Sequence, residues 1–77
     1  MKINVYPNPA GNLVNVSIEN SNGNAILKMY NMSGRLVKEQ IMDQQITELN
    51  ISKLPAGLYM IHVNDESVAK TVRFIKN

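Results

Sequence analysis

The sequence predicts an all-β fold, a small immunoglobulin-like sandwich of two sheets with about seven strands. Apolar and polar residues alternate along almost the whole chain, which gives each strand one face suited to a core. Clusters of Asn, Gly, Pro and Ser separate these segments at nearly even spacing. No segment keeps the 3.6-residue period of a helix. Short alternating strands with regular turns are typical of a two-sheet sandwich, although the pattern does not fix strand pairing or order.

The first strand is expected at residues 3–6, where it leads into a Tyr-Pro-Asn-Pro run at 6–9. Neither proline can donate to a sheet ladder, so the run belongs at a strand end or an edge. Residues 8–11 have Asn first, Pro second and Gly fourth, which is typical of a type I turn. The second strand is expected at 14–19, and the Asn-Gly pair within 20–24 is a strong hairpin signal.

The remaining strands are expected at residues 25–30, 36–41, 46–51, 58–63 and 68–75. In the turn at 31–35, Gly34 is the residue best able to adopt a positive φ. Tyr59 should be a core residue of a central strand. We expect Gly57 to hold Tyr59 in place, because its missing side chain leaves room for the turn at Pro55 to lead tightly into this strand.

The inward faces of these strands predict a single apolar core between two sheets. The expected core residues are Val5, Val14, Val16, Ile18, Leu27, Met29, Val37, Leu49, Ile51, Leu54, Tyr59, Ile61, Val63, Val72 and Phe74.

The composition excludes several classes of protein. A chain of 77 residues forms one domain of modest stability, and the lack of cysteine excludes disulfides and thiolate metal sites. The net charge of +2 comes from scattered residues, so no nucleic-acid partner is expected. The apolar runs are too short for a transmembrane helix, and the first residues lack the apolar stretch of a signal peptide.

No group of residues predicts catalysis, and neither a cofactor nor a metal is expected. The one histidine, His62, lies on the polar side of a strand without the partners that a general base requires. Asp65 and Glu66 lack the surrounding ligand series of a calcium loop. No serine has the context of a nucleophile elbow. The residues alone therefore predict a small all-β module that is not an enzyme.

Four motifs in order carry a family resemblance. They are a Tyr-Pro-Asn-Pro opening, a strand ending in Tyr-Asn before a Gly-Arg turn, a Leu-x-x-Gly-x-Tyr strand and a basic-apolar final strand. The corresponding residues are Tyr6, Pro7, Asn8, Pro9, Tyr30, Asn31, Gly34, Arg35, Leu54, Gly57, Tyr59, Lys70, Arg73 and Lys76. In this arrangement the chain resembles the type A C-terminal sorting domain of type IX secretion (Por secretion) system cargo. Asn31 replaces the commoner Asp, and Asn77 ends the chain in place of a basic residue.

The resemblance implies a secretion signal. Residues 1–77 would be the excised tail of a larger secreted protein, with Met1 an added start and the signal peptide at the distant N-terminus of the parent. The implied partners are the attached N-terminal cargo domains, the type IX translocon and its attachment or sortase components. The cargo would pass through the periplasm and reach the cell surface or the medium, and a sortase-like peptidase would remove the tail.

Recognition is expected at an exposed strand edge, because a signal shared by unrelated cargo must be read from the domain itself. The candidate is the final strand at 68–75, with Lys70, Arg73 and Lys76 as contacts. Each charge could equally be a solubilising residue of an ordinary edge. The alternative function is an immunoglobulin-like adhesion or carbohydrate-binding module, which usually presents exposed aromatic residues. The full-length gene distinguishes the sorting function from this alternative, because a sorting domain lies at the C-terminus of its protein.

Overall fold

Seven β-strands form the chain in the computed structural model, which describes residues 2–19, 24–66 and 68–77. They are β1 (Lys2–Tyr6), β2 (Leu13–Glu19), β3 (Ala25–Tyr30), β4 (Leu36–Met42), β5 (Ile46–Asn50), β6 (Gly57–Asn64) and β7 (Ala69–Lys76). The seven expected strands are thus confirmed, with ends that differ by no more than one residue. The alternating pattern located them well because each strand has one buried face.

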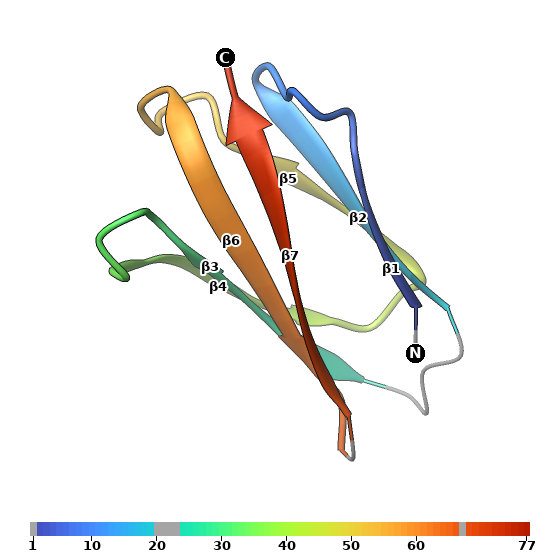
Figure 1. Cartoon of the computed structure of the whole chain (residues 1–77). Coiled ribbons are helices and arrows are strands. Elements are labelled where there is room, and N and C mark those ends of the chain that lie inside the picture. The colour runs from blue at the N-terminus through green and yellow to red at the C-terminus, as the bar shows by residue number, and fades with distance from the viewer. Residues whose placement is uncertain (1, 20–23, 67) are drawn as a thin grey trace.

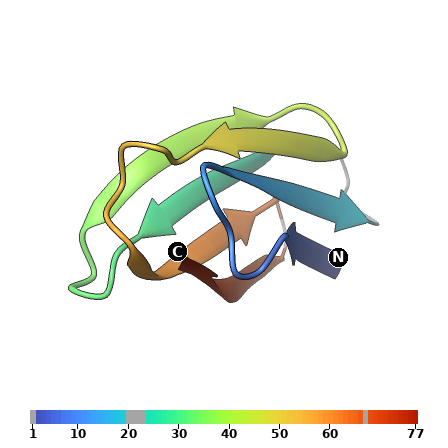
Figure 2. The same ribbon diagram turned by 90° about the horizontal axis from the view of Figure 1, so that it is seen from above.

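The strands form two antiparallel sheets that pack face to face (Figures 1 and 2). One sheet has the order β1-β2-β5 and the other the order β4-β3-β6-β7. The predicted immunoglobulin-like sandwich is therefore confirmed. The hairpin expected at the Asn-Gly pair is wrong: residues 20–23 lie outside the described part of the chain, but the flanking β2 and β3 belong to different sheets.

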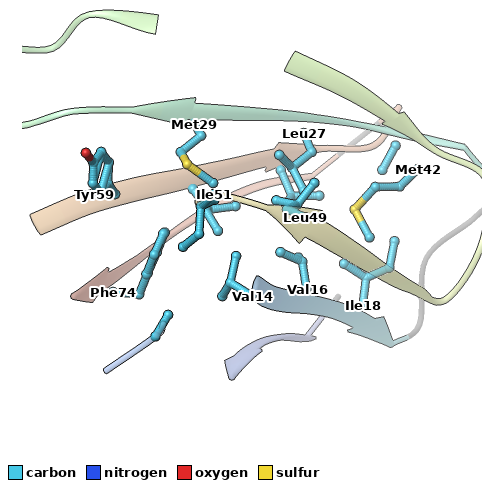
Figure 3. Packing of buried hydrophobic residues seen from close by; sticks show 14 residues of the cluster. Val14, Val16, Ile18, Leu27, Met29, Met42, Leu49, Ile51, Tyr59 and Phe74 are labelled. Carbon is cyan, nitrogen blue, oxygen red and sulfur yellow. The ribbon is translucent and has the colours of Figure 1, made fainter. Parts of the chain in front are cut away.

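The apolar core lies between the two layers (Figure 3). Most of the expected core residues are buried, while four are only partly buried: Val5, Val37, Leu54 and Val72. Three buried apolar residues were not expected: Ala10, Ala25 and Met42. Met42 extends β4 one residue past its expected end. Ala10 lies in the segment between β1 and β2, where alternation gives no information.

The N-terminus and the C-terminus lie at opposite ends of the sandwich (Figure 1). β1 leads from Lys2 to Tyr6, and the segment after it runs parallel to β7 and pairs with its last residues. We use the name distal end for the end of the sandwich that carries residues 6–10, 31–35, 54–59 and 75–77.

Candidate recognition surface

Most of the motif residues gather at the distal end. The strand register explains this grouping: Tyr30 lies opposite Met60 on β6, and Gly57 on β6 lies opposite Lys76 on β7. The Tyr-Pro-Asn-Pro run arrives at the same end from β1. Lys70 and Arg73 lie nearer the start of β7, toward the other end of the sandwich. Parts of all four motifs, which are distant in sequence, therefore share one region.

The Tyr-Pro-Asn-Pro run leads the chain from β1 to the edge of β7 in the other sheet, and the chain then returns to the first sheet as β2. Both of its X-Pro peptide bonds are cis, and Tyr6, Pro7 and Pro9 are exposed. Asn8 Oδ1 accepts a hydrogen bond of 2.9 Å from the Ile75 backbone N–H. The Ala10 N–H donates to the Ile75 carbonyl at 2.7 Å, and the Asn77 N–H donates to the Ala10 carbonyl at 2.8 Å.

These bonds show why Ala10 is buried and why the expected type I turn at 8–11 is wrong. The segment pairs with β7 as a short parallel bridge, Ala10 with Lys76, in place of a turn closed on itself. Nothing in the local sequence indicates this, because the partner strand is at the far end of the chain. The first motif and the last strand are thus one hydrogen-bonded unit.

Replacing Asn8 with Ala should loosen this unit without disturbing the core, because the Asn8 side chain is exposed apart from its bond to Ile75. We expect the free energy of unfolding to fall by about 0.5–1.5 kcal/mol. We also expect faster hydrogen exchange at the Ile75 amide, measured by NMR. Asn12→Ala is the matched control: Asn12 is also exposed, and within the described residues its bond is made by the backbone carbonyl, which the substitution keeps. Unchanged exchange at Ile75 would contradict the proposed contact.

The second motif forms a tight turn at residues 31–35, and Asn31 at its start makes most of the hydrogen bonds. Its Oδ1 accepts bonds of 3.0 Å from the N–H groups of Ser33 and Arg35. The Gly34 N–H donates to the Asn31 carbonyl at 3.0 Å, and Gly34 adopts the expected positive φ, 82°. Asparagine at the start of a turn often bonds the backbone in this way, and the turn expected at residues 31–35 is confirmed. The Arg35 side chain is exposed at the edge of the turn.

Tyr59 anchors the third motif. The residue is 4% exposed, so its predicted burial is confirmed. Its hydroxyl donates a 2.6 Å bond to the Pro55 carbonyl, and its ring stacks on Phe74 with centroids 5.7 Å apart. The explanation expected for Gly57 is wrong: a Cβ there would meet nothing within 4 Å, but φ is +153°. Glycine is needed for this backbone conformation and not for space.

The charged residues of β7 do not all face solvent. Lys70 and Arg73 are exposed, whereas Lys76 is 8% exposed. Lys76 shares the inner side of β7 with Phe74, because successive residues of a strand point to opposite faces. The expectation that Lys76 offers an accessible charge is therefore wrong, and its replacement would disturb packing.

The expected exposed edge is only partly open. β7 is an edge strand of its sheet, but residues 8–10 occupy its edge at Ile75 and Asn77. Along a strand, the backbone N–H and C=O groups of every second residue point to the same edge. The backbone groups of Thr71 and Arg73 therefore point to the same edge of β7 as those of Ile75, next to the stretch that residues 8–10 occupy. Within the described chain, no bond is formed at these edge positions. The part of β7 whose outer edge carries no bond in the described chain is therefore residues 69–73, which we call the open part of β7.

The described residues contain neither a group of metal ligands nor a helix suited to spanning a membrane. Among the described residues, no three His, Cys, Asp or Glu side chains lie close enough to hold a metal ion. His62 is half-buried, and its Nδ1 lies 3.0 Å from Thr71 Oγ1. No helix in the described ranges is long and apolar enough to cross a bilayer.

The fold and this surface define a small immunoglobulin-like recognition module. A family described as the secretion system C-terminal sorting domain matches residues 4–77. The chain belongs to this family, the sorting signals of type IX secretion, which direct cargo to the cell surface or beyond and are not a catalytic family. The predicted resemblance is confirmed.

A solved structure supports the fold. PorZ of Porphyromonas gingivalis, described as an essential bacterial surface component of the type IX secretion system, aligns with a TM-score of 0.84 at 21% identity. The alignment covers 97% of this chain and 11% of the PorZ chain, so the present chain spans about a ninth of that protein. A search of curated proteins found no match.

Proposed function

We propose that the type IX machinery reads this chain as a folded tail of a larger secreted protein, residues 1–77 forming the whole signal. The observation that supports this most directly is the hydrogen-bonded unit of residues 8–10 with the end of β7. It makes the two outermost family motifs depend on each other. A signal of this kind exists only when the domain is folded, which suits cargo whose other domains are unrelated.

The geometry suits a tail whose cargo precedes it. A chain entering at Lys2 arrives at the end of the sandwich opposite the distal end (Figure 1). Cargo attached there would leave the distal end accessible. In this proposal the parent crosses the periplasm, the translocon and attachment components recognise the domain, and a sortase-like peptidase cleaves upstream of it.

The contact we propose for the machinery is the open part of β7. An edge strand can accept a partner strand through its backbone, while side chains supply specificity. Lys70 and Arg73 are exposed at this stretch and would select an acidic partner. Lys76 takes no direct part in this contact, because it is buried.

The double change Lys70→Ala with Arg73→Ala tests this contact in a reporter carrying a signal peptide, a neutral reporter protein and residues 2–77, which include all of β1. Both side chains are exposed, so the melting temperature of the isolated domain should stay within a few degrees of the parent. In a type IX-competent host, we expect less reporter on the surface and more in the periplasm, measured by fractionation.

Lys2→Ala with Lys28→Ala is the control for a loss of two positive charges, since neither residue lies on β7. We expect this control to be exported normally. Normal export of the Lys70 and Arg73 variant would exclude these charges and leave the backbone edge or the intact fold as the signal.

The alternative, an adhesion or carbohydrate-binding module, is not favoured. Tyr59 and Phe74 are buried and stack on each other, and Tyr30 is half-buried. Tyr6 alone among the described aromatic residues is exposed. The described surface therefore lacks the group of exposed rings on which a sugar usually stacks.

A further inference from the structure

The two sides of the sandwich differ. On one side, residues 8–10 pass from the β1 sheet to β7 and tie the sheets together. On the other side lie the edge strands β4 and β5, which are not paired with each other. Figure 2 shows β4 and β5 along the top of the view and β1 and β7 along the bottom. The β4–β5 side is thus the open side of the fold.

A groove lies on this open side, between the start of β4 and residues 50–54. Its volume is about 190 Å³, and it is lined by Val37, Lys38, Asn50, Ser52, Lys53 and Leu54. Val37 and Leu54 are partly buried and pack against the core, so they provide an apolar surface. The volume is that of about six water molecules, since each occupies roughly 30 Å³ in the liquid. This suits one or two side chains of a bound segment.

The charge of the groove is of one sign. Both ionisable residues of its lining are lysines, Lys38 and Lys53. The neighbouring acids point elsewhere: Glu39 lies opposite Lys28 on the outer face, and Glu48 alternates with the buried Thr47 and Leu49. Within the part of the chain that the structure describes, neither lysine forms an ion pair. Two ammonium groups over an apolar surface repel each other and attract an anion.

The position of Lys38 follows from the regular part of the register between β3 and β4. Lys38 lies opposite the buried Met29, and the register shifts only beyond this pair, between Met29 and Tyr30. Lys38 therefore occupies an inward position of an edge strand and is half-buried. A charge placed this way discourages uncharged strands from adding to the edge. A segment that carries a carboxylate is not discouraged in this way, because its charge is opposite to that of Lys38.

We propose that this groove binds an extended, acidic peptide segment of a partner protein. One carboxylate lies between Lys38 and Lys53, and a neighbouring aliphatic side chain packs on Val37 and Leu54. This site is separate from the edge of β7, and its binding chemistry does not depend on the sorting role. It gives the partly buried motif residue Leu54 a function besides packing. The small size predicts weak binding, with a dissociation constant in roughly the high micromolar to millimolar range.

An NMR titration of the ¹⁵N-labelled chain tests the proposal. The probe is the acetylated and amidated peptide Leu-Glu-Leu-Glu-Leu, and the matched peptide has Gln in place of each Glu. We expect saturable shifts at the amides of residues 37–38 and 52–54 with the acidic peptide. The Gln peptide should bind at least about tenfold more weakly, because it keeps the shape and loses the charge.

Charge reversal provides the second arm. Lys38→Glu with Lys53→Glu should abolish binding of the acidic peptide and create binding of the corresponding Lys peptide. Lys70→Glu, an exposed lysine on β7, should leave binding unchanged. A thermal melt verifies that each variant is folded, and Lys53→Ala alone provides a milder change if the double variant unfolds.

Equal binding of the Glu and Gln peptides would overturn the proposal, as would an absence of shifts at these amides at about 5 mM peptide, a concentration above the expected dissociation constant. Inorganic phosphate added at the same concentration should not displace the peptide. Full displacement would show a general anion site and contradict the assignment to a peptide segment.

Discussion

Replacing Tyr59 with Ala is expected to unfold most of the chain. The change removes a buried ring, its stacking on Phe74 and its hydroxyl bond to Pro55. Truncation of a buried aromatic residue costs roughly 3–5 kcal/mol, and small domains have total stabilities near the low end of 5–15 kcal/mol. Loss of the strand signal in circular dichroism at 25 °C, or a fall of more than about 15 °C in melting temperature, is the expected result.

Two controls identify the cause. Tyr59→Phe keeps the ring and removes only the bond to the Pro55 carbonyl, so we expect a loss of about 0.5–1.5 kcal/mol. Tyr30→Ala truncates the same residue type on the outer face of β3, where it is half-buried, and should cost less than Tyr59→Ala. If Tyr59→Ala melts within a few degrees of the parent, the ring does not support the core as described.

Deletion of residues 71–77 should have a still larger effect. It removes most of β7, including Phe74, Val72 and the buried stem of Lys76. It also leaves β6 as an unpaired edge and takes away the partners of Asn8 and Ala10. We expect an unfolded chain in solution, measured by circular dichroism and by rapid proteolysis, and a reporter fusion that stays in the periplasm.

Deletion of Asn77 alone is the matched control for the length of the chain. It removes one backbone bond to Ala10 and leaves β7 complete, so stability should fall by about 1 kcal/mol. A folded domain after the longer deletion would contradict the role of β7 in the core. Surface delivery of that truncated fusion would contradict its role in sorting.

The strands and most of the core could be predicted from the sequence, because burial of one face imposes a period of two. Tyr59, Ile61 and Val63 on β6 illustrate this: each is buried, and its neighbours in the strand are not fully buried. Gly34 could also be predicted, since a turn between two strands needs a residue with positive φ.

The arrangement between strands could not be predicted in this way. Asn-Gly favours a local hairpin, yet β2 and β3 join different sheets, because sheet membership depends on contacts between distant segments. Ala10 is buried only because its partner is β7. Lys76 continues the alternation of β7 to the inner side, and its charge led to the opposite expectation. For the recognition surface, the sequence identified the motif residues but not their common position at the distal end.

The central claim is that the folded domain is sufficient as a sorting signal, and export of the reporter fused to residues 2–77, which include all seven strands, tests it most directly. In a type IX-competent host, the account predicts that the reporter reaches the cell surface or the medium, and that it stays in the periplasm of the same host without a working translocon. A fusion that is folded, as shown by protease resistance of the tail, yet remains in the periplasm of the competent host would contradict the claim.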